Sequence, residues 1–179
     1  MARPHYPREQ LTPTRWHTPH SVTEFADYDI DWHYRGREGL ASRENVSSIS
    51  TSYGSFISRD TDSLLFSDWG LPSNVFHTVT GIELLLETQR LARIQDKTIQ
   101  IWSGRNLVGE NQQNLDAENT QTYGGPNSLW GVAPHNLTDI SRREWGIVID
   151  LQPHTSIPCN ETVYIHRVRL RVWILEDNT

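Results

Sequence analysis

The sequence predicts an all-β protein, an antiparallel sandwich, from three observations. Short segments rich in β-branched and aromatic residues recur at intervals of about ten residues. Clusters of glycine, proline, asparagine and aspartate separate these segments and mark turns. Several segments alternate apolar and polar side chains, which is the period of a half-buried strand. A helical pattern is short and confined to residues 137–143, so the many short strands favour a sandwich.

The first 35 residues differ in composition from the rest of the chain. Four prolines exclude a helix there and favour an extended conformation. A purely disordered tail rarely contains so many large aromatic side chains. We therefore expect an extended N-terminal arm at 1–35, which lies on its own domain or on a neighbouring subunit, and a sandwich domain at 36–179. The candidate assembly contacts on this arm are Trp16, Phe25, Tyr28 and Trp32.

Residues 27–34 permit two interpretations. Aromatic and apolar side chains alternate there with aspartates, which predicts a half-buried strand. The acidic residues from Asp27 to Glu38 are also spaced like the ligands of an EF-hand calcium loop. Trp32, however, stands where that loop needs glycine, and no helical pattern flanks it. We favour the strand and expect no metal site.

Six further strands are expected along the chain. They lie at 46–53, 63–67, 79–88, 98–102, 145–151 and 164–174. Segment 79–88 has two distinct faces: its apolar face carries Ile82, Leu84 and Leu86, and its polar face carries Glu83 and Glu87. Asp96 and Lys97 are expected to form the turn before residue 98.

The last strand, 164–174, has the clearest alternation. Its apolar face carries Tyr164, His166, Val168, Leu170, Val172 and Ile174. We expect His166 to be a core histidine. The opposite face carries a row of arginines, Arg167, Arg169 and Arg171. These should pair with Glu83 and Glu87 across the sheet or contact a protein partner.

The segment 111–134 is too long for an ordinary connection inside a small domain. Its second half contains Tyr123, two glycines, a proline, Leu129 and Trp130. A long loop is either functional or held in place by its own side chains. We expect Tyr123, Leu129 and Trp130 to be buried and to hold it, with Gly124 or Gly125 at backbone angles that other residues avoid.

Composition excludes several functional classes. The net charge of −6 argues against non-specific nucleic-acid binding, which needs a positive field. No apolar run reaches the roughly 20 residues of a membrane span, and the N-terminal sequence contains no apolar stretch typical of a signal peptide. The single cysteine, Cys159, excludes an internal disulfide. The chain has seven tryptophans, and Lys97 is its only lysine, so that its other Lys/Arg residues are all arginines. Both features favour a protein that docks on other proteins.

No catalytic or cofactor motif is present in the sequence. Gly124 and Gly125 precede a proline rather than a helix, so they cannot hold a phosphate at a helix N-terminus. His17 and His20 are separated by Pro19, which prevents the helix that would align them as metal ligands. We therefore expect no catalytic residue, no metal and no cofactor. Exposed aromatic rings can stack on sugars, and the candidates for this are Trp69, Trp102 and Trp130.

Several motifs within residues 60–175 resemble a module found in virion structural proteins of tailed bacteriophages. The motifs are Thr80-Gly81-Ile82-Glu83-Leu84, the charged segment 94–101, the segment 104–111, the loop Tyr123-Gly124-Gly125-Pro126 with Leu129-Trp130-Gly131, the segment Trp145-Gly146-Ile147-Val148 and the closing strand 163–173. The resemblance implies a jelly-roll-like β-sandwich that serves as a structural piece of the tail, neck, baseplate or fibre region. It assigns no catalytic residue, and the arm at 1–35 lies outside it.

We therefore expect a non-enzymatic virion structural protein, made in the host cytoplasm and located in the virion. It should form a homo-oligomer and dock on other virion proteins around the tail or neck, or decorate the capsid. Nucleic acid and membrane are not expected partners. The alternative is a carbohydrate-binding module of a host-receptor-binding device, whose partner would be a glycan on the host surface.

Overall fold

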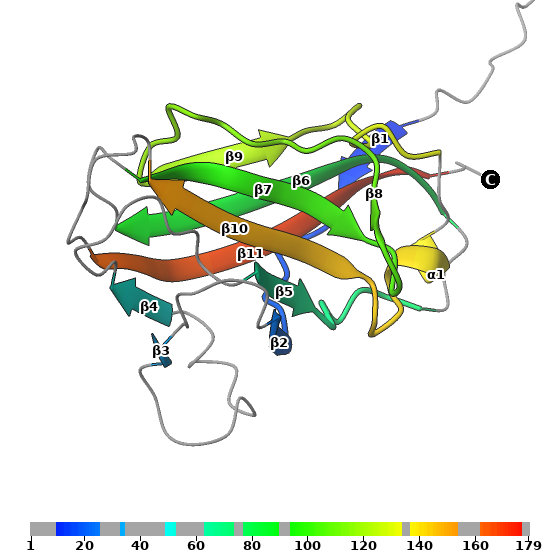
Figure 1. The fold of residues 1–179 in the computed structure, drawn as a ribbon. Helices are drawn as coiled ribbons and strands as arrows, with labels where there is room; N and C mark the ends of the chain where they lie inside the picture. Colours follow the sequence, from blue (N-terminus) through cyan, green and yellow to red (C-terminus); the bar gives the residue numbers. More distant parts are fainter. Residues whose placement is uncertain are drawn as a thin grey trace, which may run out of the picture.

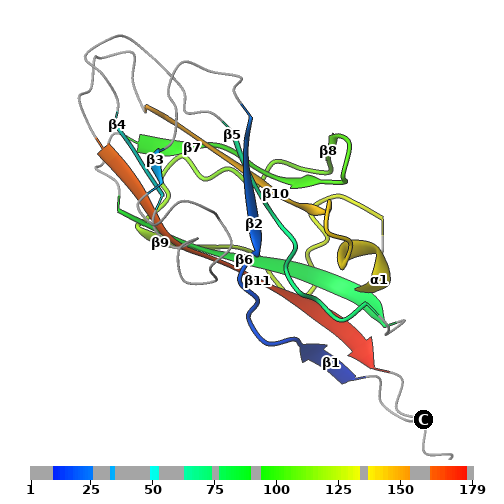
Figure 2. The same cartoon turned by 90° about the horizontal axis from the view of Figure 1, so that it is seen from below.

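The computed structural model describes residues 10–25, 33–34, 49–52, 63–73, 77–89, 94–133, 137–153 and 162–176. Their strands form two antiparallel sheets that pack as the two layers of a sandwich (Figures 1 and 2). The predicted all-β fold class is confirmed, because the described helix is a single short one, α1 (Leu137–Ile140). None of the described helices is long and apolar enough to cross a membrane.

Each sheet is built around one central pair of strands. The first sheet has the order β3 (His33–Tyr34), β4 (Ile49–Ser52), β11 (Thr162–Glu176), β6 (Thr78–Gln89) and β9 (Thr120–Gly124), and β1 (Gln10–Pro13) also pairs with β11. The second sheet has the order β2 (Ser21–Phe25), β5 (Ser63–Ser67), β10 (Gly146–Pro153), β7 (Ile94–Trp102) and β8 (Leu107–Val108). Strands adjacent in the sheets are mostly distant in sequence, so non-local pairing dominates the fold.

The core lies between the sheets and follows the predicted alternation. The first sheet contributes Ile82, Leu84, Leu86, Val168, Leu170 and Val172, and the second contributes Leu64, Phe66, Ile99, Ile101, Ile147 and Ile149. All of these side chains are buried. Burial of one such side chain stabilises the fold by about 1.5–3 kcal/mol. The alternating strands therefore account for the tight association of the two layers.

The described part of the predicted arm belongs to the sandwich itself. Strand β1 pairs with β11, and β2 pairs with β5 in the other sheet. Between them, His17 and Leu170 exchange backbone hydrogen bonds of 2.7 and 2.8 Å. Residues 10–25 thus cross from one sheet to the other (Figure 2), and the boundary predicted at residue 36 does not separate them from the domain. Tyr28, Trp32 and the calcium-like spacing from Asp27 to Glu38, apart from His33 and Tyr34 in β3, lie outside the described residues.

The prediction of a turn at Asp96 and Lys97 is wrong. Both residues lie inside β7, and Asp96 is fully buried. Its carboxylate accepts hydrogen bonds from the Tyr123 hydroxyl (2.6 Å) and from the backbone N–H of Asn114 (3.0 Å). These hydrogen bonds offset the free-energy cost of burying the acid. Their donors lie in distant segments, so the local sequence does not reveal them.

The prediction that His166 belongs to the core is also wrong. The pairing of β11 with β6 shifts register between Ile165 and Arg167, which indicates a β-bulge. Ile165 is buried and His166 is exposed as a result. Beyond the bulge the predicted alternation holds, and Val168 lies in the core.

Candidate functional site

Two of the three tryptophans considered for sugar stacking are structural. Trp130 is 1% exposed, and its indole N–H donates a 3.1 Å hydrogen bond to the carbonyl of Ile82. Trp69 is 2% exposed and belongs to the core. Trp102 alone of the three is half-buried and presents part of its ring to the surface.

The loop at 123–131 is held by its own side chains, as predicted. Tyr123 and Trp130 are buried, and Leu129 is partly buried against the core. Gly124 has a φ of +78°, and an added Cβ there would lie 2.1 Å from the carbonyl oxygen of Ile82. The loop also exchanges backbone hydrogen bonds with Ile82 through Gly125 and Ser128. The buried aromatic residues of the most distinctive motif therefore close the sandwich.

Two arginines of the row, Arg167 and Arg171, pair with carboxylates of their own sheet, as predicted. Arg171 donates hydrogen bonds of 2.7 and 3.0 Å to Glu83, and Arg167 donates one of 2.8 Å to Glu87. The indole N–H of Trp173 donates a further bond of 2.9 Å to Glu83. These pairs lie on the face of the first sheet that is turned away from the core.

Trp16, one of the candidate assembly contacts, adds to this cluster. The guanidinium carbon of Arg171 lies 4.5 Å from the ring centroid of Trp16 and 5.1 Å from that of Trp173. A guanidinium between two indole rings is held by cation–π attraction on both sides. Trp16 therefore fastens residues 10–25 to β11, and much of its apolar surface is used within the chain.

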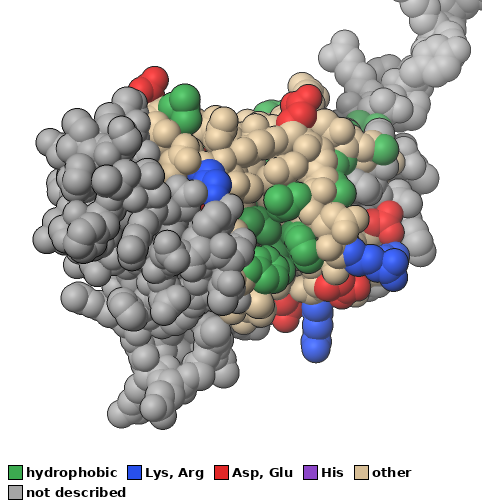
Figure 3. Space-filling view, in the orientation of Figure 1, with side chains coloured by type: hydrophobic (Ala, Val, Ile, Leu, Met, Phe, Trp, Pro, Cys, Tyr) green, Lys and Arg blue, Asp and Glu red, His purple; other side chains and the backbone are tan. Residues whose placement is uncertain are grey.

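Phe25 belongs to an apolar surface on the second sheet. We call it the outer patch and define it by Phe25 of β2, Ser63 of β5, Trp102 of β7, Leu107 of β8 and Val148 of β10, which together line a hollow of about 200 Å³. Figure 3 shows hydrophobic side chains gathered on this face of the molecule, over the sheet that contains β7 and β10. Every strand of the second sheet contributes one residue to the outer patch.

Alternation along the strands explains the outer patch. Val148 lies between Ile147 and Ile149, whose side chains point into the core, so its own side chain points to the outer face of the sheet, where it is covered and only 3% exposed. The rings of Phe25 and Trp102 have centroids 5.4 Å apart and are tilted by 44°. Leu107 remains 44% exposed. Sequence reasoning identified Phe25 and Trp102 singly, but it missed Leu107 and Val148, because only the sheet order places them together.

No group of three or more histidine, cysteine or acidic side chains in the described ranges is arranged to hold a metal ion. His17 and His20 do line one hollow, but the third basic side chain in its lining is that of Arg15, which is not a metal ligand.

The sequence matches no protein-family model and no curated protein. Among solved structures, the chain is similar to the family 11 carbohydrate-binding module from Clostridium thermocellum, a structure in complex with a β-1,3-1,4-mixed-linked tetrasaccharide. The TM-score is 0.32, the identity is 10%, and the match covers 87% of each chain. At this TM-score the likeness carries no argument about what the present chain binds.

Proposed function

We propose that this chain is a non-catalytic structural protein of a bacteriophage particle, which docks on other particle proteins through the outer patch. The observation that supports this docking surface is the apolar surface formed by the half-buried rings of Phe25 and Trp102 together with the exposed side chain of Leu107. The particle role rests on the resemblance of the motifs between residues 60 and 175 to virion structural modules.

The composition of the outer patch favours a protein partner over a sugar. Sugar binding combines ring stacking with hydrogen bonds to several hydroxyl groups. Among the described residues that line this hollow, Ser63 is the only one with a polar side chain other than the indole of Trp102. The nearby amide of Gln100 already donates hydrogen bonds to the carbonyls of Val108 and Gly109. An apolar side chain of a partner protein gains more from such a surface, because aromatic anchors in a dry pocket dominate the binding energy of protein interfaces.

The test is incorporation into particles. We expect the wild-type chain to be detected by mass spectrometry in purified particles of the phage that encodes it. Leu107→Asp places a charge in the outer patch, on its edge strand β8, and should be strongly depleted from particles. Leu115→Asp is the matched control, because Leu115 is 50% exposed and lies outside the outer patch. Circular dichroism of both variants checks that they are folded.

Two results contradict the proposal separately. Normal incorporation of Leu107→Asp shows that the outer patch is not the docking surface. Absence of the wild-type chain from purified particles refutes the particle role itself.

The second candidate function is glycan binding at the same surface. It is favoured by one observation, the contact of Phe25 and Trp102 on an open face. A glycan that stacks on these rings should change the fluorescence of Trp102, and Trp102→Ala should abolish the response. Retention of the response in Leu107→Asp, together with normal incorporation into particles, would favour this second function.

A further inference from the structure

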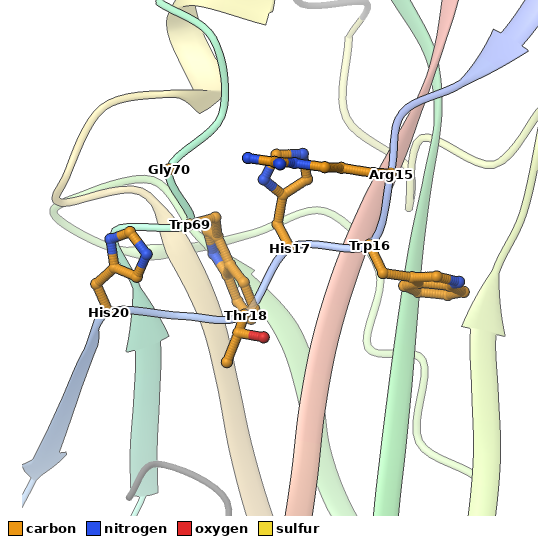
Figure 4. Close-up of a pocket in the computed structure, with 7 residues that line it drawn as sticks. All are labelled: Arg15, Trp16, His17, Thr18, His20, Trp69 and Gly70. Atoms are coloured by element: carbon orange, nitrogen blue, oxygen red, sulfur yellow. The ribbon is translucent and has the colours of Figure 1, made fainter. Parts of the chain in front are cut away.

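A second hollow, distinct from the outer patch, lies between the segment 15–20 and the turn at Trp69 and Gly70. It has a volume of about 330 Å³. Figure 4 shows Arg15, His17 and His20 around it, with the indole of Trp69 drawn between the two histidines. We call it the basic hollow. It differs from the outer patch in that its lining contains three side chains that are or can become cationic, and none of the described residues that line it is acidic.

Backbone contacts hold both walls of the basic hollow in place. His17 is fixed by its two backbone hydrogen bonds to Leu170, and the backbone N–H of His20 donates a 2.9 Å bond to the carbonyl of Asp68. Asp68 and Gly70 both have positive φ angles, +52° and +62°. A Cβ added at Gly70 would lie 3.0 Å from the imidazole carbon Cε1 of His20, so the turn packs closely against that ring. A non-glycine residue at positive φ costs free energy and is found preferentially at functional positions.

The groups in the basic hollow repel one another when the hollow holds no ligand. Burial lowers the pKa of His17, and the charges of Arg15 and His20 lower it further, while a hydrogen bond to the backbone of Trp69 opposes them. In the part of the chain that the structure describes, no carboxylate forms an ion pair with Arg15. The indole N–H of Trp69 is buried and has no hydrogen-bond acceptor among the described residues. A buried donor without an acceptor is destabilising. A negative ligand would in addition relieve the repulsion among Arg15, His17 and His20.

We propose that the basic hollow binds one oxyanion group, a carboxylate or a phosphate, between Arg15, His17 and His20. The guanidinium of Arg15 supplies paired N–H donors that match the oxygens of such a group. The imidazoles of His17 and His20, which line the same hollow, supply further N–H donors. A metal ion does not suit the site, because the Arg15 charge repels it and two histidines alone complete no coordination shell.

The experiment follows the imidazole signals of His17 and His20 by NMR while inorganic phosphate or sodium acetate is added to the full chain at constant ionic strength. We expect a saturable shift with a dissociation constant in the millimolar range. Arg15→Gln should weaken it by about tenfold or more, the loss expected for a charge-assisted hydrogen bond. Arg15 is exposed, so this variant should remain folded. Arg105→Gln is the matched control, since Arg105 is also exposed and lies in the turn between β7 and β8.

The two probes distinguish the source of the oxyanion. Saturation by acetate identifies a carboxylate, such as an acidic side chain of a partner protein, and saturation by phosphate alone identifies a phosphate group. A linear drift with both probes, or an equal loss in Arg15→Gln and Arg105→Gln, overturns the proposal, because either result is general ionic screening. These readouts do not involve the outer patch, so their failure leaves the proposed docking function intact.

Discussion

The hydroxyl of Tyr123 donates a 2.6 Å hydrogen bond to the carboxylate of Asp96 and thereby connects the two sheets of the sandwich. Tyr123 lies in β9 of the first sheet and Asp96 in β7 of the second. Both are buried, so the bond is shielded from water. The carboxylate of Asp96 also holds the start of the long segment after residue 111, because the same oxygen accepts a hydrogen bond from the backbone N–H of Asn114.

Tyr123→Phe should therefore destabilise the protein by about 1–3 kcal/mol, because it removes a hydrogen bond from a buried charged group. Urea denaturation of the wild-type protein and the variant measures the difference. Thr122→Ala, an exposed change on the same strand, should stay within about 0.5 kcal/mol of the wild type. Equal stability of Tyr123→Phe and wild type would show that the bond between the sheets contributes little.

Gly124→Ala should be more destabilising than Gly125→Ala. At Gly124 a Cβ meets the carbonyl oxygen of Ile82 at 2.1 Å, whereas at Gly125 it meets nothing within 4 Å. Both positions have a positive φ, so the second variant isolates the backbone strain, which is of order 1–3 kcal/mol. Thermal unfolding should place Gly124→Ala well below Gly125→Ala. The reverse order would mean that Ile82 can move away from the added methyl group.

Acid should weaken the cluster around Glu83. Burial raises the pKa of Glu83, but hydrogen bonds from Arg171 and Trp173 and the charge of Arg171 outweigh it and lower the pKa below its usual value of 4.5. A carboxyl whose pKa is lower in the folded state contributes stability above its unfolded pKa and loses that contribution as the pH falls through its folded pKa. Urea midpoints of wild type and Glu83→Gln should therefore differ most near neutral pH and converge as the pH falls below 4.5 and through the lower folded-state pKa. A constant difference across this range would assign the effect to packing alone.

Removal of residues 1–35 should strongly destabilise the domain. The expected domain boundary at residue 36 implies that such a truncated chain folds, but the deletion removes β1, β2 and the buried Val22. Circular dichroism and urea denaturation should show loss of cooperative unfolding. A chain that begins at Gln10 keeps every described strand and should be as stable as the full-length protein. A stable chain from residue 36 would show that the two sheets close without their first strands.

Alternation predicted the parts of this fold that depend on local sequence. The apolar face of Ile82, Leu84 and Leu86 and the pairing of Glu83 with Arg171 both follow from a period of two along extended strands. Prediction failed at His166, where a bulge shifts the period by one residue. It failed at Asp96 for a different reason, because the partner that satisfies the buried acid lies 27 residues away in the chain.

The candidate sites depended still more on non-local pairing. Phe25 and Trp102 were recognisable as aromatic residues, but their contact requires the order of strands in the second sheet. The sequence shows that His17 and His20 lie close together along the chain. Only the structure shows that these histidines, Arg15 and the turn at Trp69 line one basic hollow. The type of each side chain can thus be read from the sequence, whereas the order of the strands in the sheets determines which side chains lie next to one another.

The pairing of β1 with β11 determines how the domain responds to mechanical force. Gln10 lies opposite Glu176, and Pro13 lies opposite Trp173, so the two ends of the described chain meet at one end of an antiparallel pair. A load applied across Gln10 and Glu176 pulls perpendicular to both strands and along their hydrogen bonds. Such a load opens the bonds one after another, as in a zipper, rather than shearing them together. A partner that holds the rest of the sandwich could therefore remain attached while tension peels β1 away as far as Thr14 and Trp16.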